Sequence, residues 1–556
     1  MGEKIVIIGG VAAGASAATK ARRTAEDAEI IIFERGSYVS FANCGLPYYV
    51  GGEIREREQL FLVTPEMFKQ RFNIEVKVKH EVVSINRSEK YVEVLDQSTG
   101  ASFHQPYTKL VIATVGTPVR PPIPGINLPG ISTLWTVPDV DSIMQTIATR
   151  KVDTVAIVGG GFVGLETAEA FINRGVKVHI VEMLTQVMMP MDSEMAGIIA
   201  GQLEEKGAEV ILGDGVAQFH GQSRLEEIEL ASGRRIKVDL AVVAVGVKPE
   251  LKLVMDAGLS LGETKGVLVD EKMQTSDPAI YAAGDIVESI NLLTGKKVRV
   301  PLAGPANKQG RVAGANAAGG NLAFEGVLGT MVVKVCDITA AKTGLNEREA
   351  TEAGLDYFVS YTHNGDHAGY YPGAKPMVIK LLAEKGSGRI LGGQIVGYHG
   401  VDKRIDVLAT AIYGKMTVKN LENLDLAYAP PYSSAKDPVI MAGFVAANVL
   451  RGEVELITGA QLLEGIKRGE DIQVVDVRTK EEFDYKHIAG AKHIPVDSMR
   501  DRAGELDPGK TTVVYCGVGY RSYLAYRILR SKGFSKLKNF SGGFQSWLLT
   551  EAVEKG

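Results

Sequence analysis

The 556-residue sequence predicts a multidomain α/β protein, because three of its regions alternate apolar strands with helices. Two regions share one pattern, in which an apolar strand leads through a glycine-rich turn into a helix of small residues: KIVIIGGVAAGASAA from Lys4 and TVAIVGGGFVGLETAEAF from Thr154. The third region begins near Val454 and contains the strands QVVDVR and TTVVYC, with helical segments around them. A chain of this length exceeds a single hydrophobic core, so we expect three or four domains.

Composition narrows the class of protein. Hydrophobic residues make up 45%, charged residues 23%, and the net charge is −4, so no broad basic surface is offered to nucleic acid or to acidic membranes. No run of about 18 apolar residues occurs, and the first apolar run is interrupted by glycines, so we expect neither a transmembrane helix nor a signal peptide. Three cysteines cannot form a disulfide framework, which favours a reducing cytoplasm and individually reactive thiols.

The first glycine turn is typical of a dinucleotide site, with Val11 in place of the middle glycine of G-x-G-x-x-G. The following strand, EIIIFE, ends 25 residues after Gly9 in a carboxylate that can accept both ribose hydroxyls. A later strand, AIYAAGD, ends in a Gly-Asp pair of the kind that closes over the ribityl chain of FAD. The predicted FAD residues are Gly9, Gly10, Gly14, Glu34, Gly284 and Asp285.

The second glycine turn satisfies the fingerprint fully, with Gly159, Gly161 and Gly164. The strand VKVHIVE after it ends in Glu182, 23 residues beyond Gly159. A carboxylate at this place binds the 2′-hydroxyl of NAD and repels the 2′-phosphate of NADP, and no arginine follows it closely. The sequence therefore predicts NADH, while lysines elsewhere leave NADPH as an alternative.

The order of these signals predicts two Rossmann-like dinucleotide-binding domains, with the FAD domain split around the NAD domain. The glycine fingerprints stop near residue 325, and the strands that follow indicate an α+β domain with an antiparallel sheet. Cys336, in the strand VVKVCDI, is predicted to be a core residue. The predicted domains are 1–115 with 246–325 for FAD, 116–245 for NAD, 326–450 for dimerisation, and 454–556 for a closing α/β domain.

Cys44 is the candidate redox residue, in SYVSFANCGLPYYVGG just after the first βαβ unit. Disulfide oxidoreductases of this fold usually carry C-x4-C beside the flavin, but position 49 here is Tyr49. A lone cysteine cannot form an intramolecular disulfide, so its oxidised form must be a mixed disulfide, a persulfide or a sulfenic acid.

A second reactive cysteine is predicted in the closing domain, where YCGVGYRS places Cys516 between a strand and a helix. The glycine loop turns backbone N–H groups towards the sulfur, the helix N-terminus adds positive potential, and Arg521 adds a full charge, so the thiolate is favoured. Phosphatases of related architecture need one more residue between cysteine and arginine to make room for a phosphate. The spacing here therefore favours a sulfur substrate over a phosphate. The upstream run VVDVRTKEEFDYKHIAGAKHIP matches the rhodanese pattern, with residues expected to hold the loop at Asp476, Arg478 and His487.

Two motifs carry a resemblance to a known family: SFANCGLPY around Cys44 and AYAPPYSSAKDP from Ala427. The chain resembles the coenzyme A (CoA)-disulfide reductases of the pyridine nucleotide-disulfide oxidoreductases. With the rhodanese-like domain, it resembles their fused branch, which includes NADH-dependent persulfide reductases. The resemblance implies a homodimer in which the third domain of one subunit completes the active site of the other. It further implies two active-site tyrosines, Tyr370 and Tyr428, and the CoA-binding residues Lys20, Arg23, Ser40, Asn43, Asn307 and Lys436.

The predicted function is an NAD(P)H-dependent flavoprotein reductase of CoA disulfide, CoA persulfide or polysulfide. Cys44 would perform the reduction, Cys516 would deliver sulfane sulfur, and CoA would be a bound cofactor or a substrate; no metal is expected. One alternative is an NADH peroxidase or oxidase that cycles Cys44 through sulfenic acid. Another is a sulfur-trafficking or redox-sensing protein without reductase activity.

Overall fold

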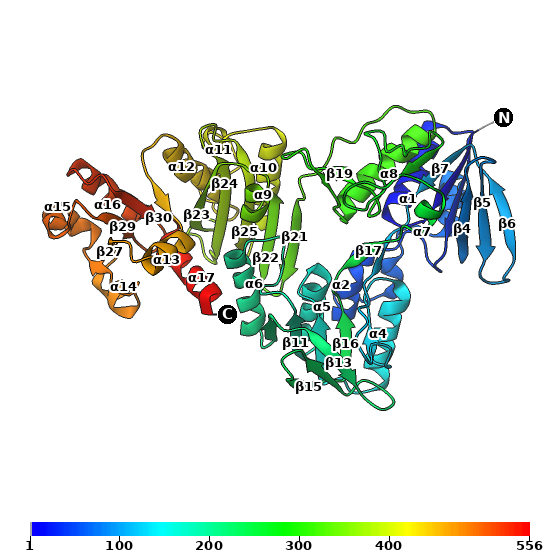
Figure 1. Cartoon of the computed structure of the whole chain (residues 1–556), viewed down its shortest axis with the longest axis horizontal. Coiled ribbons are helices and arrows are strands. Elements are labelled where there is room, and N and C mark those ends of the chain that lie inside the picture. Colours follow the sequence, from blue (N-terminus) through cyan, green and yellow to red (C-terminus); the bar gives the residue numbers. More distant parts are fainter. Residues whose placement is uncertain (1–2, 556) are drawn as a thin grey trace. The chain divides into compact units, whose positions relative to one another are not determined.

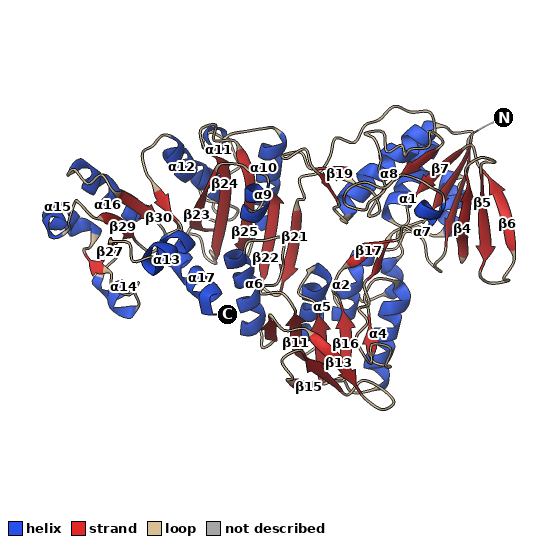
Figure 2. Cartoon of the chain, in the orientation of Figure 1, coloured by secondary structure: helices blue, strands red, loops and turns tan. Residues whose placement is uncertain are grey.

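The computed structural model describes residues 3–555 and consists of two compact units, coloured along the chain in Figure 1 and by secondary structure in Figure 2. The first unit contains residues 3–183 and Gly207–Val327, and the second contains Leu184–Lys206 and 328–555. Among the residues described, no helix has both the length and the apolar character that a membrane span requires.

A five-stranded parallel sheet forms the core of the first unit. Its central strand, KIVII, is apolar on both faces, as a strand covered on both sides requires. Helices α1 (Ala12–Thr24) and α8 (Ala303–Ala317) cross at close range, because a Cβ on Gly310 would lie 2.1 Å from the Ala13 carbonyl oxygen. In sheet order the strands are β18 (Ile280–Ala282), β7 (Lys109–Ile112), β1 (Lys4–Ile8), β2 (Glu29–Glu34) and β3 (Glu75–Val78).

A second parallel sheet repeats this arrangement, and its central strand leads into helix α5 (Phe162–Asn173). Its strands are, in sheet order, β12 (Glu209–Leu212), β11 (Lys177–Glu182), β10 (Thr154–Val158), β16 (Leu240–Val243) and β9 (Ile131–Ser132). In both sheets the strand before the glycine turn pairs in parallel with the strand that ends in the acid. The two predicted Rossmann-like units are therefore confirmed.

The first unit also carries small antiparallel sheets and short helices. The sheets are β4 (His80–Asn86), β5 (Tyr91–Asp96) and β6 (Ser102–Pro106); β13 (Val216–His220), β14 (Glu227–Leu230) and β15 (Arg235–Lys237); β8 (Gly116–Pro118) with β17 (Val247–Pro249); and β19 (Ser289–Ile290) with β20 (Lys297–Val298). The helices are η1 (Asn43–Gly45), α2 (Leu46–Gly51), η2 (Arg57–Leu60), α3 (Pro65–Phe72), α4 (Val137–Thr149) and α7 (Lys252–Asp256).

The second unit begins its core with a five-stranded antiparallel sheet, which confirms the predicted α+β region. In sheet order its strands are β21 (Met331–Val335), β22 (Ile338–Gly344), β25 (Ile390–Gly397), β24 (Pro376–Glu384) and β23 (Tyr357–Gly365). Its helices are α6 (Ser193–Glu205), α9 (Glu347–Glu352), α10 (Val401–Tyr413), α11 (Val418–Leu421) and α12 (Pro438–Leu450). Cys336 is buried, as predicted, but lies in the turn between β21 and β22 with φ of 54°.

A separate parallel sheet follows, and this confirms the predicted closing α/β domain. Its strands are, in sheet order, β26 (Leu456–Ile457), β30 (Leu537–Phe540), β29 (Thr511–Tyr515), β27 (Ile472–Asp476) and β28 (Lys492–His493). Its helices are α13 (Gly459–Lys467), α14 (Lys480–Tyr485), η3 (Val496–Ser498), α15 (Met499–Arg502), η4 (Ala503–Glu505), α16 (Tyr520–Ser531) and α17 (Gly543–Lys555).

Two hydrogen bonds join this closing domain to strand β23 of the antiparallel sheet. The backbone N–H of Tyr361 donates to Ser541 Oγ at 2.9 Å, and His363 Nε2 lies 2.8 Å from Ser546 Oγ. Burial lowers the pKa of His363 to about 4, so the imidazole is neutral near pH 7. Ser541 lies two residues before α17 and Ser546 lies in its first turn, so the start of this helix contacts the antiparallel sheet.

A buried ammonium group holds α6 against the same sheet. Lys380 on β24 is fully buried, and its Nζ contacts carboxylates of three residues: Asp192 at 2.6 Å, Glu347 at 2.5 Å, and Glu194. Gln394 Nε2 adds a hydrogen bond to Asp192 at 2.6 Å. Attraction to these carboxylates outweighs burial and raises the pKa of Lys380, so the side chain stays charged.

We expect Lys380→Met to destabilise the second unit by about 3–5 kcal/mol, because three clustered carboxylates lose their counter-charge. Urea unfolding followed by circular dichroism would measure the loss. Lys385→Met is the control, since its ion pair with Asp356 is exposed, and should change stability by less than about 0.5 kcal/mol. Equal unfolding midpoints for the two variants would contradict this role.

Candidate functional site

The first glycine turn has the shape that a dinucleotide phosphate needs. Gly9 has φ of 94°, and a Cβ on Gly14 would lie 1.9 Å from the Gly9 carbonyl oxygen, so helix and turn pack without side chains between them. Helix α1 has no side-chain cap and no acid in its first turn, which leaves its N–H groups and positive end for an anion. Glu34 accepts the Gly10 N–H at 2.9 Å, so its carboxylate lies beside the turn.

The Gly284–Asp285 segment lies at the end of β18 in the same sheet. Gly284 has φ of 91°, and its N–H donates to Gln309 Oε1 on α8 at 2.9 Å. Burial raises the pKa of Asp285, which accepts a hydrogen bond from the Gly116 backbone. The turn, the free helix end and Glu34 fit an FAD-type dinucleotide.

The second glycine turn has the same geometry. Gly159 has φ of 111°, and a Cβ on Gly164 would lie 2.0 Å from the Gly159 carbonyl oxygen. Helix α5 starts after Gly161 without a side-chain cap or an acid in its first turn. Glu182 accepts the Gly160 N–H at 2.7 Å, as Glu34 does at the first turn. These residues fit a second dinucleotide.

Cys44 lies on a loop that is tied to the first glycine turn. The N–H of Ser40 donates to the Gly10 carbonyl at 2.8 Å, and Ser40 takes φ of 47°, a strained value for serine. Cys44 is exposed in η1, and its Sγ lies 3.7 Å from Asn43 Oδ1. Burial of the thiol group, and then the negative charges of Glu166 and Asp285, raise the pKa of Cys44. An exposed thiol is thus placed on a loop that is hydrogen-bonded to the first glycine turn.

Glu166 and Tyr48 form a hydrogen-bonded pair that no sequence motif predicts. Tyr48 on α2 donates its hydroxyl hydrogen bond to Glu166 Oε1 on α5 at 3.1 Å. Burial raises the pKa of Glu166 to about 7. The only available signal was a carboxylate two residues after the last fingerprint glycine, on a helix with few other charged residues.

Several predicted CoA residues share one face of α1. Lys20 and Arg23 lie one and two helical turns beyond Ser16. Ser16 donates to Asn307 Oδ1 on α8 at 2.6 Å, which brings Asn307 to the same face. Arg23 is exposed and donates through Nε to the Thr19 carbonyl.

The two predicted active-site tyrosines meet in the second unit. The hydroxyls of Tyr370 and Tyr428 lie 2.6 Å apart, and the side chains are 76% and 47% exposed, so the phenols face solvent. Lys436 is exposed on the same loop as Tyr428.

The two tyrosine loops are joined by Arg404, which sequence reasoning also missed. Its buried guanidinium donates to the Asp366 carbonyl at 2.7 Å and forms an ion pair with Asp437 at 3.1 Å. It therefore fixes the loop before Tyr370 to the loop after Tyr428.

Cys516 has the predicted cradle but is buried. Its Sγ accepts the Gly519 N–H at 3.1 Å and lies 3.5 Å from Ser522 Oγ. Arg521 carries the predicted charge and also forms an ion pair, because both of its terminal nitrogens bind Glu482 at 2.7 Å. This ion pair lowers the pKa of Glu482 to about 2.

The loop around Cys516 is supported from behind. The Phe544 N–H, at the start of α17, donates to the Cys516 carbonyl at 2.7 Å. The buried guanidinium of Arg478 stacks 4.1 Å from the Phe544 ring and pairs with Asp476. Asp476 and Arg478 therefore hold the loop through Phe544, whereas His487 stacks on Phe483 at 3.9 Å.

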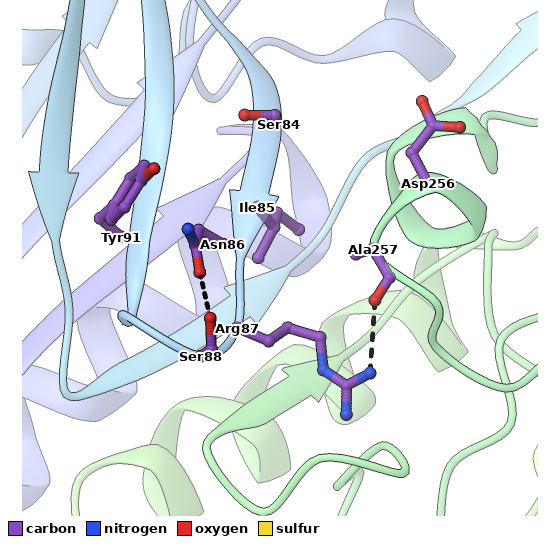
Figure 3. Close-up of a pocket in the computed structure, with 8 residues that line it drawn as sticks. All are labelled: Ser84, Ile85, Asn86, Arg87, Ser88, Tyr91, Asp256 and Ala257. Carbon is purple, nitrogen blue, oxygen red and sulfur yellow. Dashed lines mark hydrogen bonds between the residues drawn. The ribbon is translucent and has the colours of Figure 1, made fainter.

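A shallow cavity of about 520 Å³ also lies in the first unit, between the tip of β4 and α7 (Figure 3). Its cation, Arg87, already binds Asp277 at 2.8 Å and the Ala257 carbonyl at 3.3 Å. None of the predicted site residues lines this cavity.

Comparison with known proteins gives three family matches along the chain. They are the pyridine nucleotide-disulphide oxidoreductases over residues 3–310, their dimerisation domain over 330–439, and the rhodanese-like domain over 458–550. An NAD(P)H sulfur oxidoreductase (CoA-dependent) of Pyrococcus abyssi is 37% identical over 80% of this chain and 98% of its own length. A coenzyme A disulfide reductase of Staphylococcus haemolyticus is 34% identical over 80% of this chain and 100% of its own.

Two solved structures resemble the whole chain. Reduced CoADR-RHD of Bacillus anthracis has a TM-score of 0.96 and 42% identity, covering 100% of this chain and 99% of its own. An NAD-dependent persulfide reductase of A. fulgidus has a TM-score of 0.91 and 43% identity, covering 98% of this chain and 100% of its own.

Proposed function

Since the chain belongs to the pyridine nucleotide-disulphide oxidoreductase family, we propose that it is an NADH-dependent flavoprotein that reduces sulfur–sulfur bonds through Cys44. The substrates we propose are CoA disulfide, CoA persulfide and polysulfide. The observation that carries this proposal is the exposed Cys44, on a loop hydrogen-bonded to the first nucleotide turn and without a second cysteine nearby.

In this proposal FAD binds at the first glycine turn, in a split domain made of residues 1–115 and 246–325. NADH binds in the domain made of residues 116–245. When bound, FAD would supply the route for two electrons from NADH to sulfur. The chain's own residues orient the two nucleotides through Glu34 and Glu182, and hold their phosphates at the helix ends of α1 and α5.

The sulfur chemistry begins with attack by the Cys44 thiolate on one sulfur of the substrate. The bond between the sulfurs breaks, and a CoA thiolate or hydrosulfide leaves. In the proposed homodimer, formed through residues 326–450, Tyr370 and Tyr428 donate hydrogen bonds to the leaving thiolate. The proposed CoA contacts are Lys20, Arg23, Ser40, Asn43, Asn307 and Lys436, with CoA either retained or released.

The rhodanese-like domain, residues 454–556, is proposed to load sulfane sulfur. Cys516 would hold it as a persulfide against the Gly519 N–H, and transfer it to a CoA thiol that then reaches Cys44. Two reactive cysteines with different surroundings on one chain support this relay.

Turnover of NADH by the purified protein tests the proposal. CoA disulfide, CoA persulfide, polysulfide, hydrogen peroxide and oxygen would be compared as electron acceptors. We expect sulfur compounds to be reduced fastest. Faster turnover of peroxide or oxygen would instead identify a peroxidase or oxidase, and no NADH turnover with any sulfur compound would leave a sulfur-trafficking protein.

Glu182→Ala should raise the KM for NADH by about tenfold to a hundredfold, because a charged hydrogen bond to the ribose is lost. The KM for NADPH should rise far less, so the preference for NADH narrows. Steady-state kinetics with both nucleotides would show this. Asp153→Ala, which removes only an exposed ion pair with Lys151, is the control, and an unchanged nucleotide preference in Glu182→Ala would refute the assignment.

A further inference from the structure

An open groove in the rhodanese-like domain has no part in the scheme above. It has a volume of about 510 Å³ and is lined by residues of α16 and of η3 and α15, which both contact α16 (Figure 1). Its apolar residues are Val496, Leu524 and Ile528, and two of them, Val496 and Ile528, pack against the core of the domain. The groove therefore has an apolar floor beside α16.

Helix α16 connects this groove with the loop of Cys516. Gly519, at the start of the helix, donates its N–H to Cys516 Sγ at 3.1 Å. A Cβ on Gly517 would lie 3.5 Å from a terminal nitrogen of Arg521, so this guanidinium lies against the same loop. Three groove residues follow Arg521 by three, seven and eleven positions, which places them on its face of the helix: Leu524, Ile528 and Lys532.

The charged residues of the groove are mainly basic. Among the described residues that line it, the cations are Arg500, Arg527 and Lys532, and the acid is Asp497. Arg527 donates to the Glu453 carbonyl at 3.2 Å, a neutral partner that leaves its charge uncompensated. Arg500 and Lys532 are exposed, and within residues 3–555 neither forms an ion pair with an acid. The groove therefore carries an excess of positive charge, which suits a ligand with several phosphate charges.

The length of α16 matches the length of a CoA molecule. From Gly519 to Lys532 the helix rises about 20 Å, at about 1.5 Å per residue. A pantetheine arm has the backbone length of about four residues, roughly 14 Å when extended. Phosphates placed near Ile528 and Lys532 therefore leave the arm long enough to bring its thiol to the Cys516 loop.

We propose that this groove binds the CoA molecule that accepts sulfur from Cys516. The cations hold the phosphate groups of the nucleotide, and the pantetheine arm lies along the apolar floor towards the sulfur. The groove is then a second CoA site, made of residues other than the contacts proposed for CoA at Cys44. This inference rests on the proposed function, because it supplies the binding site that transfer of sulfur to CoA requires.

The transfer needs no other reactant. The CoA thiolate attacks the outer sulfur of the Cys516 persulfide, and a new sulfur–sulfur bond forms in CoA persulfide. The bond between Cys516 Sγ and the outer sulfur breaks, and its electron pair stays on Sγ, where the Gly519 N–H stabilises the thiolate. The sum is CoA–S⁻ + Cys516–S–SH → CoA–S–SH + Cys516–S⁻, which conserves atoms, charge and oxidation state.

Chemical labelling of Lys532 tests the groove without relying on turnover. The full-length holoenzyme would be acetylated with an N-hydroxysuccinimide ester, with and without desulfo-CoA, which keeps the nucleotide but has no thiol. Mass spectrometry gives the acetylation rate of each lysine. Desulfo-CoA at ten times its Kd should slow the labelling of Lys532 about tenfold. Lys536, exposed in the same domain but outside the groove, should be labelled at an unchanged rate.

Two further probes define the ligand. Pantetheine lacks the phosphates and should leave Lys532 unprotected at the same concentration. ATP carries phosphates but no arm for the apolar floor, and should protect Lys532 less than desulfo-CoA does. Equal protection by ATP and desulfo-CoA would identify a general phosphate site and overturn the assignment to CoA.

A double variant, Arg500→Gln with Lys532→Gln, removes two charges from the groove. In transfer of sulfur from thiosulfate, its KM for CoA should rise about tenfold, because two contacts to phosphate are lost. Its KM for pantetheine as acceptor should equal that of the wild type. Arg530→Gln with Lys536→Gln is the matched control, since it removes two exposed charges of the same domain outside the groove, and should behave as the wild type.

NADH-dependent reduction of CoA disulfide would be measured on the same samples and should be unchanged in both double variants. Normal reduction with no protection of Lys532 by desulfo-CoA would overturn the groove alone. An equal KM for CoA in the two double variants would overturn it as well. Protection of Lys532 in a protein that reduces no sulfur compound would reject the proposed function and leave the CoA site standing.

Discussion

Cys44→Ser should lower the kcat/KM for NADH-dependent reduction of CoA disulfide by about a thousandfold or more. A serine hydroxyl ionises far too weakly at neutral pH to attack sulfur, and the two remaining cysteines are buried. Absorbance of NADH at saturating nucleotide would give the rate.

Cys336→Ser is the matched control, because Cys336 lies in the buried turn between β21 and β22. It should retain nearly full turnover. If Cys44→Ser kept more than about a tenth of the wild-type rate while Cys336→Ser lost activity, the assignment of the redox sulfur would be wrong.

Cys516→Ser should abolish sulfur transfer from thiosulfate or polysulfide to CoA, with a loss of about a thousandfold, because the acceptor thiolate is missing. Reduction of CoA disulfide carries no sulfane sulfur and should continue through Cys44. Assays of CoA persulfide formation and of NADH oxidation with each donor would separate the two activities.

The proposed transfer of sulfur from Cys516 through CoA to Cys44 predicts a second effect of Cys516→Ser. NADH oxidation with donors that need loading onto CoA should fall along with sulfur transfer. Should Cys516→Ser reduce every persulfide, polysulfide and thiosulfate donor at the wild-type rate, Cys516 does not supply Cys44.

The sequence predicts those parts of the site whose residues lie close together along the chain. A glycine turn, its helix and the acid that ends the next strand are encoded within about 25 residues, and the structure joins them through hydrogen bonds such as Gly10 to Glu34. The loop of Cys516 is equally local, because strand, glycines and helix follow one another directly.

The residues that the sequence did not reveal act over long separations. Glu166 meets Tyr48 across 118 positions, and Lys380 meets Glu194 across 186. Glu482, the ion-pair partner of Arg521, lies 39 residues upstream on a different helix, so the motif around Cys516 did not predict this pair. Nothing in a local pattern specifies such contacts, since they arise only when separate elements pack.

The hydrogen bonds that join Ser541 and Ser546 to β23 restrict how the rhodanese-like domain can work. The segment that carries these serines also carries Phe544, whose N–H fixes the Cys516 carbonyl. If the whole domain moved between sites, it would have to break these hydrogen bonds in every catalytic cycle. The motion would also disturb the segment that supports the Cys516 loop. A small thiol carrier is therefore better suited than a moving domain to take sulfur from Cys516 to Cys44. A fragment that begins at Val454 would lack β23, and would lose the contacts that help to shape the loop around Cys516.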